Sequence, residues 1–247
     1  MNRSFVVILT VDTPKNKTRC QRLEQVLQKS RIENVHVCFG KKAAHPSLVT
    51  QSIFESHHDI TLKYKDMCET QQKHLMILED DCVFDETQDW ATTIETNLVK
   101  LEAIQPHWCV LMCGHMPLGP NVPLFTSDLV VTCLPFAAHC YMLNYRMLSW
   151  MLREIPAKDW RRPYAVEGWT RVPLHLKFAI IPSVASQCEN PREMKQYFNP
   201  VLPHWTYTQA QTLMEHVCTW GIYLLLLLSM FAFVRHRRAK TQRRIKE

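Results

Sequence analysis

The segment KHLMILEDDCVFDE, residues 73–86, decides the fold, because four apolar residues lead straight into three consecutive carboxylates. A short apolar run of this kind predicts a strand buried on both faces, here over residues 75–78. In an open parallel sheet, ligands bind just beyond the carboxyl ends of the strands, which is where Glu79, Asp80 and Asp81 emerge. Side chains alternate along an extended backbone, so Glu79 and Asp81 are predicted to point to one side and Asp80 to the other.

The carboxylate triplet has two interpretations. Like charges held close together are costly unless a cation or solvent compensates them, and hard oxygen ligands select Mg²⁺ or Mn²⁺. A divalent ion at this place would bridge a diphosphate and stabilise it as a leaving group. The alternative is a solvated acidic turn, and the triplet by itself leaves both interpretations open.

Around this segment, short apolar runs alternate with runs that have apolar residues at helical spacing. The predicted strands are 5–10, 34–40, 75–78 and 108–114, and the predicted helices are 18–32, 56–70 and 90–104. This order predicts an α/β domain over residues 1–200, with a mainly parallel sheet and helices on both faces. Later strands at 129–133, 139–143 and 177–184, with a helix over 144–155, are predicted to form a smaller mixed region.

The charge distribution argues against nucleic acid as a partner. The chain carries a formal charge of +6, but residues 235–247 hold seven Lys or Arg and one Glu, which leaves the rest neutral. A protein that grips phosphate backbones needs its cations on the folded binding surface. The ten cysteines form no Cys-x-x-Cys pair and lie mostly in apolar runs, so they are predicted to be buried free thiols in a reducing compartment.

The C-terminal part predicts a membrane anchor. Residues 217–234 contain 18 uncharged residues and are followed at once by a basic run, as expected of a single helix that spans a bilayer about 30 Å thick. Residues 201–216 are then a juxtamembrane connector, and 235–247 a basic tail. The apolar run near the N-terminus is too short for a signal peptide, which favours a C-terminal anchor with the body in the cytosol and leaves a lumenal body as the alternative.

Six motifs, taken in order, resemble the family 25 glycosyltransferases, which include lipopolysaccharide-biosynthesis and collagen galactosyltransferase-like domains. The motifs are VILTVDTPKNKTRCQRL, SIFESHHDI, LMILEDDCVF, AAHCYMLNYRMLSWML, VEGWTR and IIPSVASQ, and they lie within residues 7–187. Two departures stand out: Ser52 and Ile53 replace a Gly-Cys pair of the family, and Glu167 stands where the family has Asp. The resemblance implies a GT-A-like fold and sugar transfer from a nucleotide-sugar donor to a hydroxyl on a glycan, protein or lipid acceptor, with Mn²⁺ or Mg²⁺.

The resemblance also implies roles for particular residues. Glu79 and Asp81 would bind the metal, and Asp80 would help to bind the donor. The other donor-binding candidates are Asp12, Lys15, Arg19 and His57, with Lys17 beside them. Glu167, and after it Asp159, would be the base that takes the proton of the acceptor hydroxyl. His139 and His175 are candidates to complete the metal shell, and Gln187 matches a family position without a chemical role that we can derive. For His57 and Glu167 the alternatives are a helix-start histidine bonded to backbone and a surface residue.

The sequence therefore predicts a membrane-anchored hexosyltransferase. The alternative is a glycosyltransferase-like body that has lost activity and acts as a membrane-tethered interaction module, which the two departures from the family pattern favour. A metal-dependent phosphoesterase is a third option, but such sites draw carboxylates and histidines from several strand ends, and the sequence offers no second cluster.

Overall fold

The computed structural model describes residues 3–117, 120–124, 128–133, 135–155 and 172–187 of the body. In the C-terminal part it describes residues 209, 211–221, 223–224, 228–229 and 232. The predicted base candidates Asp159 and Glu167 lie outside the described residues.

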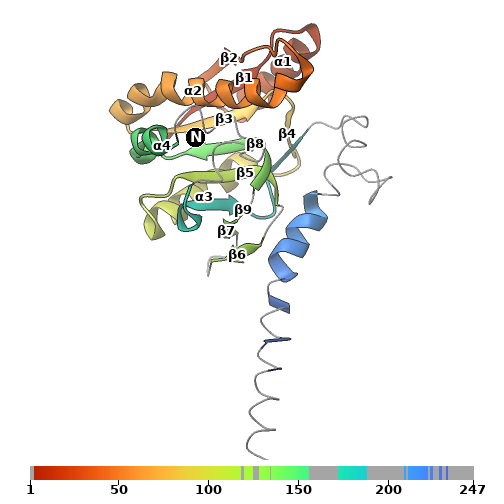
Figure 1. Ribbon diagram of the computed structural model, residues 1–247, viewed down its shortest axis with the longest axis vertical. Coiled ribbons are helices and arrows are strands. Elements are labelled where there is room, and N and C mark those ends of the chain that lie inside the picture. The colour runs from red at the N-terminus through yellow and green to blue at the C-terminus, as the bar shows by residue number, and fades with distance from the viewer. Residues whose placement is uncertain are drawn as a thin grey trace, which may run out of the picture.

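Up to residue 117 the chain alternates strands and helices as predicted, except for the short strand β4, which was not predicted (Figure 1). The strands are β1 (Ser4–Thr10), β2 (Val35–Phe39), β3 (His74–Glu79), β4 (Cys82–Phe84), β5 (Val110–Pro117), β6 (Asn121–Pro123), β7 (Leu129–Thr132), β8 (Pro135–Leu143), β9 (Lys177–Ile180) and β10 (Ala185–Gln187). The helices are α1 (Pro14–Lys29), α2 (Val49–Gln71), α3 (Trp90–Ile104) and α4 (Leu148–Glu154), with short 3₁₀ turns at Pro46–Leu48, Tyr145–Met147 and Leu174–Leu176.

Eight strands form one sheet in the order β2-β1-β3-β8-β5-β9-β7-β6, and β4 pairs with β10 in a separate small sheet. Strands β7 and β8 run against the other six, so the large sheet is mixed but mostly parallel in direction. This confirms the predicted α/β class. The later strands were predicted to form a smaller mixed region, and the two reversed strands, β7 and β8, do belong to this later part. They join the same large sheet, in which β8 inserts between β3 and β5.

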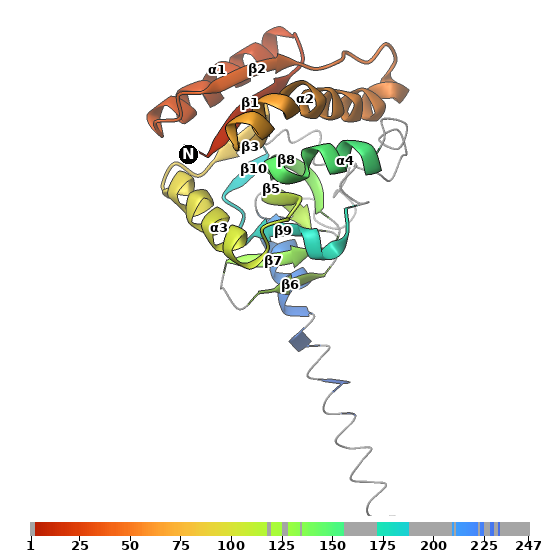
Figure 2. The same ribbon diagram turned by 90° about the vertical axis from the view of Figure 1, so that its left-hand side faces the viewer.

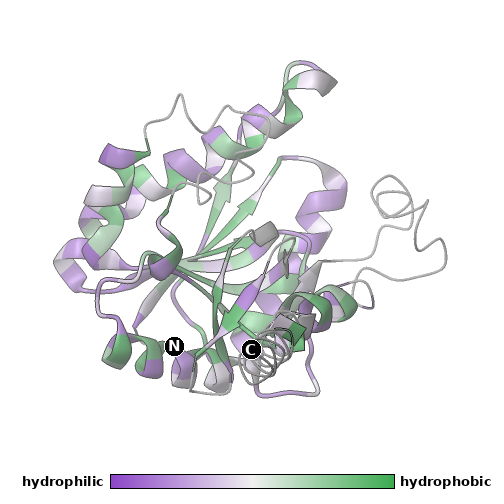
Figure 3. Cartoon of the chain, turned by 60° about the horizontal axis from the view of Figure 1, so that its bottom comes forward, coloured by the Kyte–Doolittle hydropathy of each residue, from purple (hydrophilic) through white to green (hydrophobic). Residues whose placement is uncertain are grey.

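Helices cover both faces of the sheet, as predicted (Figure 2). On one face, α1 and α3 pack on the buried side chains of Val6 and Leu78; on the other, α2 and α4 pack on Val7 and Ile77. Alternate residues of β1 and β3 therefore contribute to two apolar cores, one on each face of the sheet. Helices with hydrophilic and hydrophobic residues interspersed surround the sheet in Figure 3, a pattern typical of amphipathic helices.

The prediction that the cysteines are mostly buried and form no disulfides is confirmed for the residues that the structure describes. Nine cysteines are free, and seven of them are buried: 20, 38, 68, 82, 109, 113 and 140. Cys133 and Cys218 are half-buried, and Cys188 lies outside the described residues.

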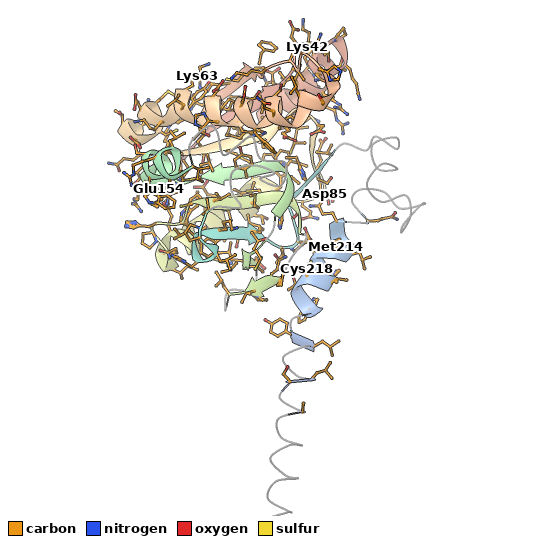
Figure 4. The ribbon with its side chains drawn as sticks, viewed as in Figure 1. Lys42, Lys63, Asp85, Glu154, Met214 and Cys218 are labelled. Carbon is orange, nitrogen blue, oxygen red and sulfur yellow. The ribbon has the colours of Figure 1, made fainter. Side chains whose placement is uncertain are left out.

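A C-terminal helical segment, residues 211–221, docks on the body through polar side chains. The Gln211 amide donates to the carbonyl oxygens of His115 and Ala185 at 2.9 and 3.3 Å. Both Glu215 carboxylate oxygens accept from the backbone N–H of Ser183 at 3.3 Å, and burial raises the pKa of this carboxyl. Figure 4 shows the labelled Met214 and Cys218 on the same segment.

The predicted membrane span, residues 217–234, is only partly described. Among the described residues, no helix is both long enough and apolar enough to cross a membrane.

His74, at the start of β3, is a buried neutral histidine. The backbone N–H of Tyr145 donates to its Nδ1 at 3.4 Å, so Nε2 carries the proton that is donated to Glu102 Oε1 at 3.1 Å. Its ring packs against Trp108 and Tyr145 with centroids 5.0 and 5.2 Å apart. Burial lowers the pKa of His74 to about 4; the Glu102 carboxylate opposes that shift, and the Arg146 and Arg3 cations add to it.

We expect acid to destabilise the fold through His74. The unfolded histidine titrates near 6.5, so below that pH the unfolded chain takes up a proton that the folded chain excludes down to about 4. The stabilisation is complete above pH 6.5, and about 2 kcal/mol of it is lost by pH 5. Urea unfolding at pH 7.5 and 5.0 measures the loss, and His74→Asn should show a smaller difference between the two pH values. Equal pH dependence in both proteins would contradict this assignment.

Candidate functional site at the ends of β1 and β3

The parallel strands β1 and β3 end together. Leu9 pairs with Glu79 in register, and the N–H of Asp80 donates to the Leu9 carbonyl at 3.0 Å. The N–H of Gly40, which follows β2, donates to the Thr10 carbonyl at 2.7 Å. The carboxylate triplet thus begins at the carboxyl edge of three neighbouring strands, where the sequence predicted a ligand site.

Asp80 is the most constrained carboxylate of the triplet. Its Oδ2 accepts a hydrogen bond of 2.5 Å from the Thr10 hydroxyl, and its Oδ1 lies 3.7 Å from Arg19 Nη1 on α1. Its side chain is 10% exposed. Burial raises the pKa of Asp80, while the Thr10 hydrogen bond and the Arg19 charge act in the opposite direction. A carboxylate whose charge is disfavoured by burial gains from an additional cation nearby.

Glu79 points to the opposite side of the strand, toward α2, as the predicted alternation requires. Its Oε1 lies 3.1 Å from Nε2 of His57, and Nδ1 of the same ring lies 2.6 Å from the hydroxyl of Tyr141 on β8. His57 was predicted to line the donor pocket; the structure places it under Glu79 with no exposed side-chain surface. Asp81 is buried in the turn between β3 and β4.

Local packing brings His57 to this position. Gly40 allows α2 to approach, because a Cβ at that residue would lie 2.8 Å from the Ser56 hydroxyl oxygen. That hydroxyl donates to the Ser52 carbonyl at 2.6 Å and accepts from the Lys41 N–H at 2.8 Å. Ser52 is part of one departure from the family pattern, and it takes part in this packing only through its backbone carbonyl, which accepts the hydrogen bond from Ser56.

A small, solvent-open cleft lies beside Asp80, between α1 and β4. Its polar lining consists of Arg19, Arg22, Asp80 and Glu86, and its apolar lining of Leu23, Val26, Cys82, Val83 and Phe84. Sequence reasoning missed Arg22, although it lies three residues after Arg19 and therefore on the same helix face. The cleft places two guanidinium groups next to the carboxylate triplet.

The other predicted site residues that the structure describes do not line this cleft. Asp12 and Lys15 are exposed, and Asp12 forms a 2.9 Å ion pair with Lys17 at the start of α1. His139 is buried, with its Nε2 3.2 Å from the Ala185 carbonyl oxygen. His175 is exposed and lies just before β9. It is therefore at the amino ends of the parallel strands, whereas Glu79 is at their carboxyl ends. Gln187 ends β10, paired with Cys82.

The residues that the structure describes contain no group of three or more His, Cys, Asp or Glu side chains arranged to hold a metal ion. A metal bound here would need ligands from the substrate in addition to one or two carboxylates, as Mg²⁺ takes in many phosphate-binding sites. The predicted metal roles of Glu79 and Asp81 stay predictions.

Searches against family models and against curated proteins found no match, so the resemblance to family 25 stays a prediction. Among solved structures, a glycosyltransferase involved in the glycosylation of the major capsid of PBCV-1 is 11% identical, with a TM-score of 0.45 over 78% of this chain and 98% of its own. A putative glucose-1-phosphate thymidylyltransferase from Bacillus anthracis is 10% identical, with a TM-score of 0.39 over 70% of this chain and 85% of its own. Mouse xyloside xylosyltransferase 1 is 9% identical, with a TM-score of 0.37 over 85% of this chain and 93% of its own.

These structural neighbours are glycosyltransferases and a sugar nucleotidyltransferase. Their TM-scores lie below 0.5, so the function proposed below rests on the side chains at the ends of β1 and β3.

Proposed function

We propose that the chain is a glycosyltransferase that binds a nucleotide-sugar donor at the ends of β1 and β3 and moves the sugar to a hydroxyl acceptor. This proposal rests mainly on the surroundings of Asp80. Its carboxylate contacts both Thr10 and Arg19, and it lines the same cleft as Arg19 and Arg22. Carboxylates next to guanidinium groups suit a diphosphate with its metal, because the carboxylates would hold the metal and the guanidinium groups would bind the phosphate oxygens.

The residues fit a divalent cation, Mn²⁺ or Mg²⁺. Burial disfavours the charge of Asp80, and the second carboxylate, Asp81, is buried next to it. Asp81, with Asp80, would hold the ion, and the diphosphate of the donor would complete its ligands. When bound, the ion acts as a Lewis acid on the leaving diphosphate.

Arg19 and Arg22 would hold the phosphate oxygens and offset the negative charge that grows on the leaving diphosphate. A planar guanidinium group binds two phosphate oxygens at once and keeps its charge at any physiological pH. Lys15 and Lys17, which are exposed at the start of α1, would contribute by long-range attraction of the donor.

We also propose that the C-terminal segment anchors the body to a membrane, with the body in the cytosol. Five apolar side chains along the helical segment are between 40 and 62% exposed: Val217, Trp220, Tyr223, Leu224 and Leu228. Trp220 and Tyr223 pack together with ring centroids 5.5 Å apart, and such residues favour the interface between lipid and water.

Donor binding can be tested on the full chain in detergent. We expect one nucleoside diphosphate from a panel of uridine, guanosine and thymidine diphosphates, with Mn²⁺, to stabilise the protein by about 2.7 kcal/mol at a hundredfold excess over Kd. The double variant Arg19→Gln/Arg22→Gln should lose most of this stabilisation, since both phosphate-facing cations are removed. Thermal unfolding measures it, and hydrolysis of the matching nucleotide sugars then identifies the donor.

Arg153→Gln is the matched control, because Arg153 lies on α4 and its contact is an exposed ion pair with Glu154. The control should respond to the nucleotide as the unchanged protein does. Failure of every nucleoside diphosphate to stabilise the unchanged protein would overturn the proposed function and favour a membrane-tethered interaction module without activity.

A further inference from the structure

A sheet of two short strands forms part of the wall of the cleft beside Asp80. Its strand β4 contributes all of its residues, Cys82–Phe84, to the lining of the cleft. In the part of the chain that the structure describes, β4 pairs only with β10, where Phe84 lies opposite Ala185. Phe84 also stacks on Trp90 of α3, with ring centroids 3.8 Å apart. Two short strands are only marginally stable by themselves, so the position of this wall depends on what supports β10.

Strand β10 is joined to the large sheet by the C-terminal helical segment. The Gln211 amide donates to the carbonyl of Ala185, the first residue of β10, at 3.3 Å, and to that of His115 on β5 at 2.9 Å. Four residues later, the Glu215 carboxylate accepts from the backbone N–H of Ser183, two residues before β10. The helical segment therefore bridges the small sheet, which lines the cleft, and the large sheet.

The face of this segment that docks on the body is polar. Gln211, Glu215 and Thr219 follow at intervals of four residues, which places them on one helix face, and they are 3, 7 and 5% exposed. By contrast, Val217 and Trp220 are 54 and 62% exposed. A helix that packs on a soluble body normally buries its apolar face. Docking here depends mainly on buried hydrogen bonds, and the apolar face is left for the proposed membrane anchor.

We propose that Gln211 and Glu215 are positioning residues of the donor site: they hold β10, and β10 holds the β4 wall of the cleft that Arg19 and Arg22 also line. This inference rests on the proposed function, because that function assigns the cleft to the diphosphate of the donor. The same segment leads into residues 217–234, the proposed anchor. Release of the segment from β10 should loosen the cleft, so the docking of the anchor and the binding of the donor are coupled.

Hydrogen exchange in the full chain in detergent tests the link from Gln211 to β4. Leucine in place of Gln211 keeps a side chain of similar size but donates no hydrogen bond. We expect the amides of β4 and β10 to exchange about tenfold faster, the effect of losing one buried hydrogen bond. The amides of β1 and β2 should keep their rates, whereas a general loss of stability would speed up exchange in all four strands.

Donor binding tests the link from β4 to the cleft. With the nucleoside diphosphate and Mn²⁺ that stabilise the unchanged protein, Gln211→Leu should raise Kd by about threefold to tenfold, as expected for one lost hydrogen bond outside the contact shell of the ligand. The effect is partial, since the Ala185 carbonyl oxygen still lies 3.2 Å from Nε2 of His139 on β8. Calorimetric titration well below the melting temperature of both proteins measures it.

Glu215 offers a conservative variant, and the same segment offers a control. Glu215→Gln keeps an oxygen that accepts from the Ser183 N–H, so both exchange and Kd should match the unchanged protein. Glu215→Leu removes that acceptor and should behave like Gln211→Leu, which gives a second, independent test. The exposed His216 lies next to Glu215 in the chain, and His216→Leu should change neither measurement.

Three results would overturn the inference while the proposed function stands. The first is unchanged exchange in β4 and β10 of Gln211→Leu. The second is faster exchange that extends equally to β1 and β2, which would limit Gln211 to a role in overall stability. The third is faster exchange in β4 with an unchanged Kd, which would separate this wall from donor binding. Failure of every nucleoside diphosphate to bind the unchanged protein would instead overturn the proposed function, and this inference with it.

Discussion

Asparagine in place of Asp80 should lower sugar transfer by about a hundredfold to a thousandfold, the usual effect of removing one preorganised charged group from a transferase site. Asparagine keeps an oxygen that accepts from the Thr10 hydroxyl, so the backbone at the ends of β1 and β3 should keep its shape. The negative charge that faces Arg19 and the proposed metal is lost. Steady-state kinetics over a range of Mn²⁺ concentrations measure the loss, which excess Mn²⁺ should not restore.

The same substitution should not lower stability. Burial raises the pKa of Asp80, which means that the folded protein tolerates the ionised carboxylate less well than water does. We therefore expect the melting temperature of Asp80→Asn to stay the same or to rise, as is common when a strained functional group is removed.

Asp85→Asn is the matched control for Asp80→Asn. Asp85 follows β4, is exposed, and accepts hydrogen bonds from Thr87 and Gln88, which lower its pKa (Figure 4). Its replacement should leave transfer unchanged and cost a little stability. A drop in melting temperature together with full activity in Asp80→Asn would contradict the assignment.

Alanine in place of Gly114 should destabilise the fold by about 3 kcal/mol, at the upper end of the cost of overpacking. A Cβ at this residue of β5 would lie 2.6 Å from His139 Nε2, 2.7 Å from the Ala185 carbonyl oxygen and 2.9 Å from the Ala185 Cβ. The Ala185 carbonyl oxygen is a backbone atom, and the Ala185 Cβ has no rotamer to change, so neither can move aside without a shift of β10. The melting temperature should fall by about 10 °C for a domain of this size.

Gly221→Ala provides the control for Gly114→Ala. No atom lies within 4 Å of a Cβ built at Gly221, and the residue lies in a helical segment. Alanine favours a helix by up to about 1 kcal/mol over glycine, so this variant should be as stable as the unchanged protein or slightly more so. Equal melting temperatures for the two variants would show that β5, β8 and β10 are less tightly packed than described here.

Local sequence patterns predicted the strands and the carboxylates at the end of β3, because these features depend on residues that are neighbours in the sequence. The apolar run before Glu79 forms β3, and the alternation of Glu79 and Asp80 follows from it. Helix boundaries were less predictable: α2 begins at Val49 rather than at Ser56, after a 3₁₀ turn and without a side-chain cap that would mark its start.

Partners far apart in the sequence could not be predicted. The bond between His57 and Tyr141 joins residues 84 positions apart, and it exists because β8 lies beside β3. Nothing in the run HCYML specifies which strand it pairs with, since all its residues are suited to a strand buried on both faces. Arg22 was overlooked for a different reason: the cleft it lines forms only when β4 packs beside α1.

The central position of β8 has a consequence for how the chain folds. Strands β3 and β5 come off the ribosome well before residues 135–143, and β8 is the neighbour that each of them lacks until then. A nascent chain that ends before β8 leaves β3 without one neighbour and β5 without both of its neighbours, β8 and β9. Such unpaired, apolar strand edges are sites of edge-to-edge aggregation. Because pairing with β8 closes a long loop, its entropic cost makes this a slow step of folding. The reversed strand β8 thus joins β3 to β5, so the two parts of the large sheet stay separate until residues 135–143 are in place.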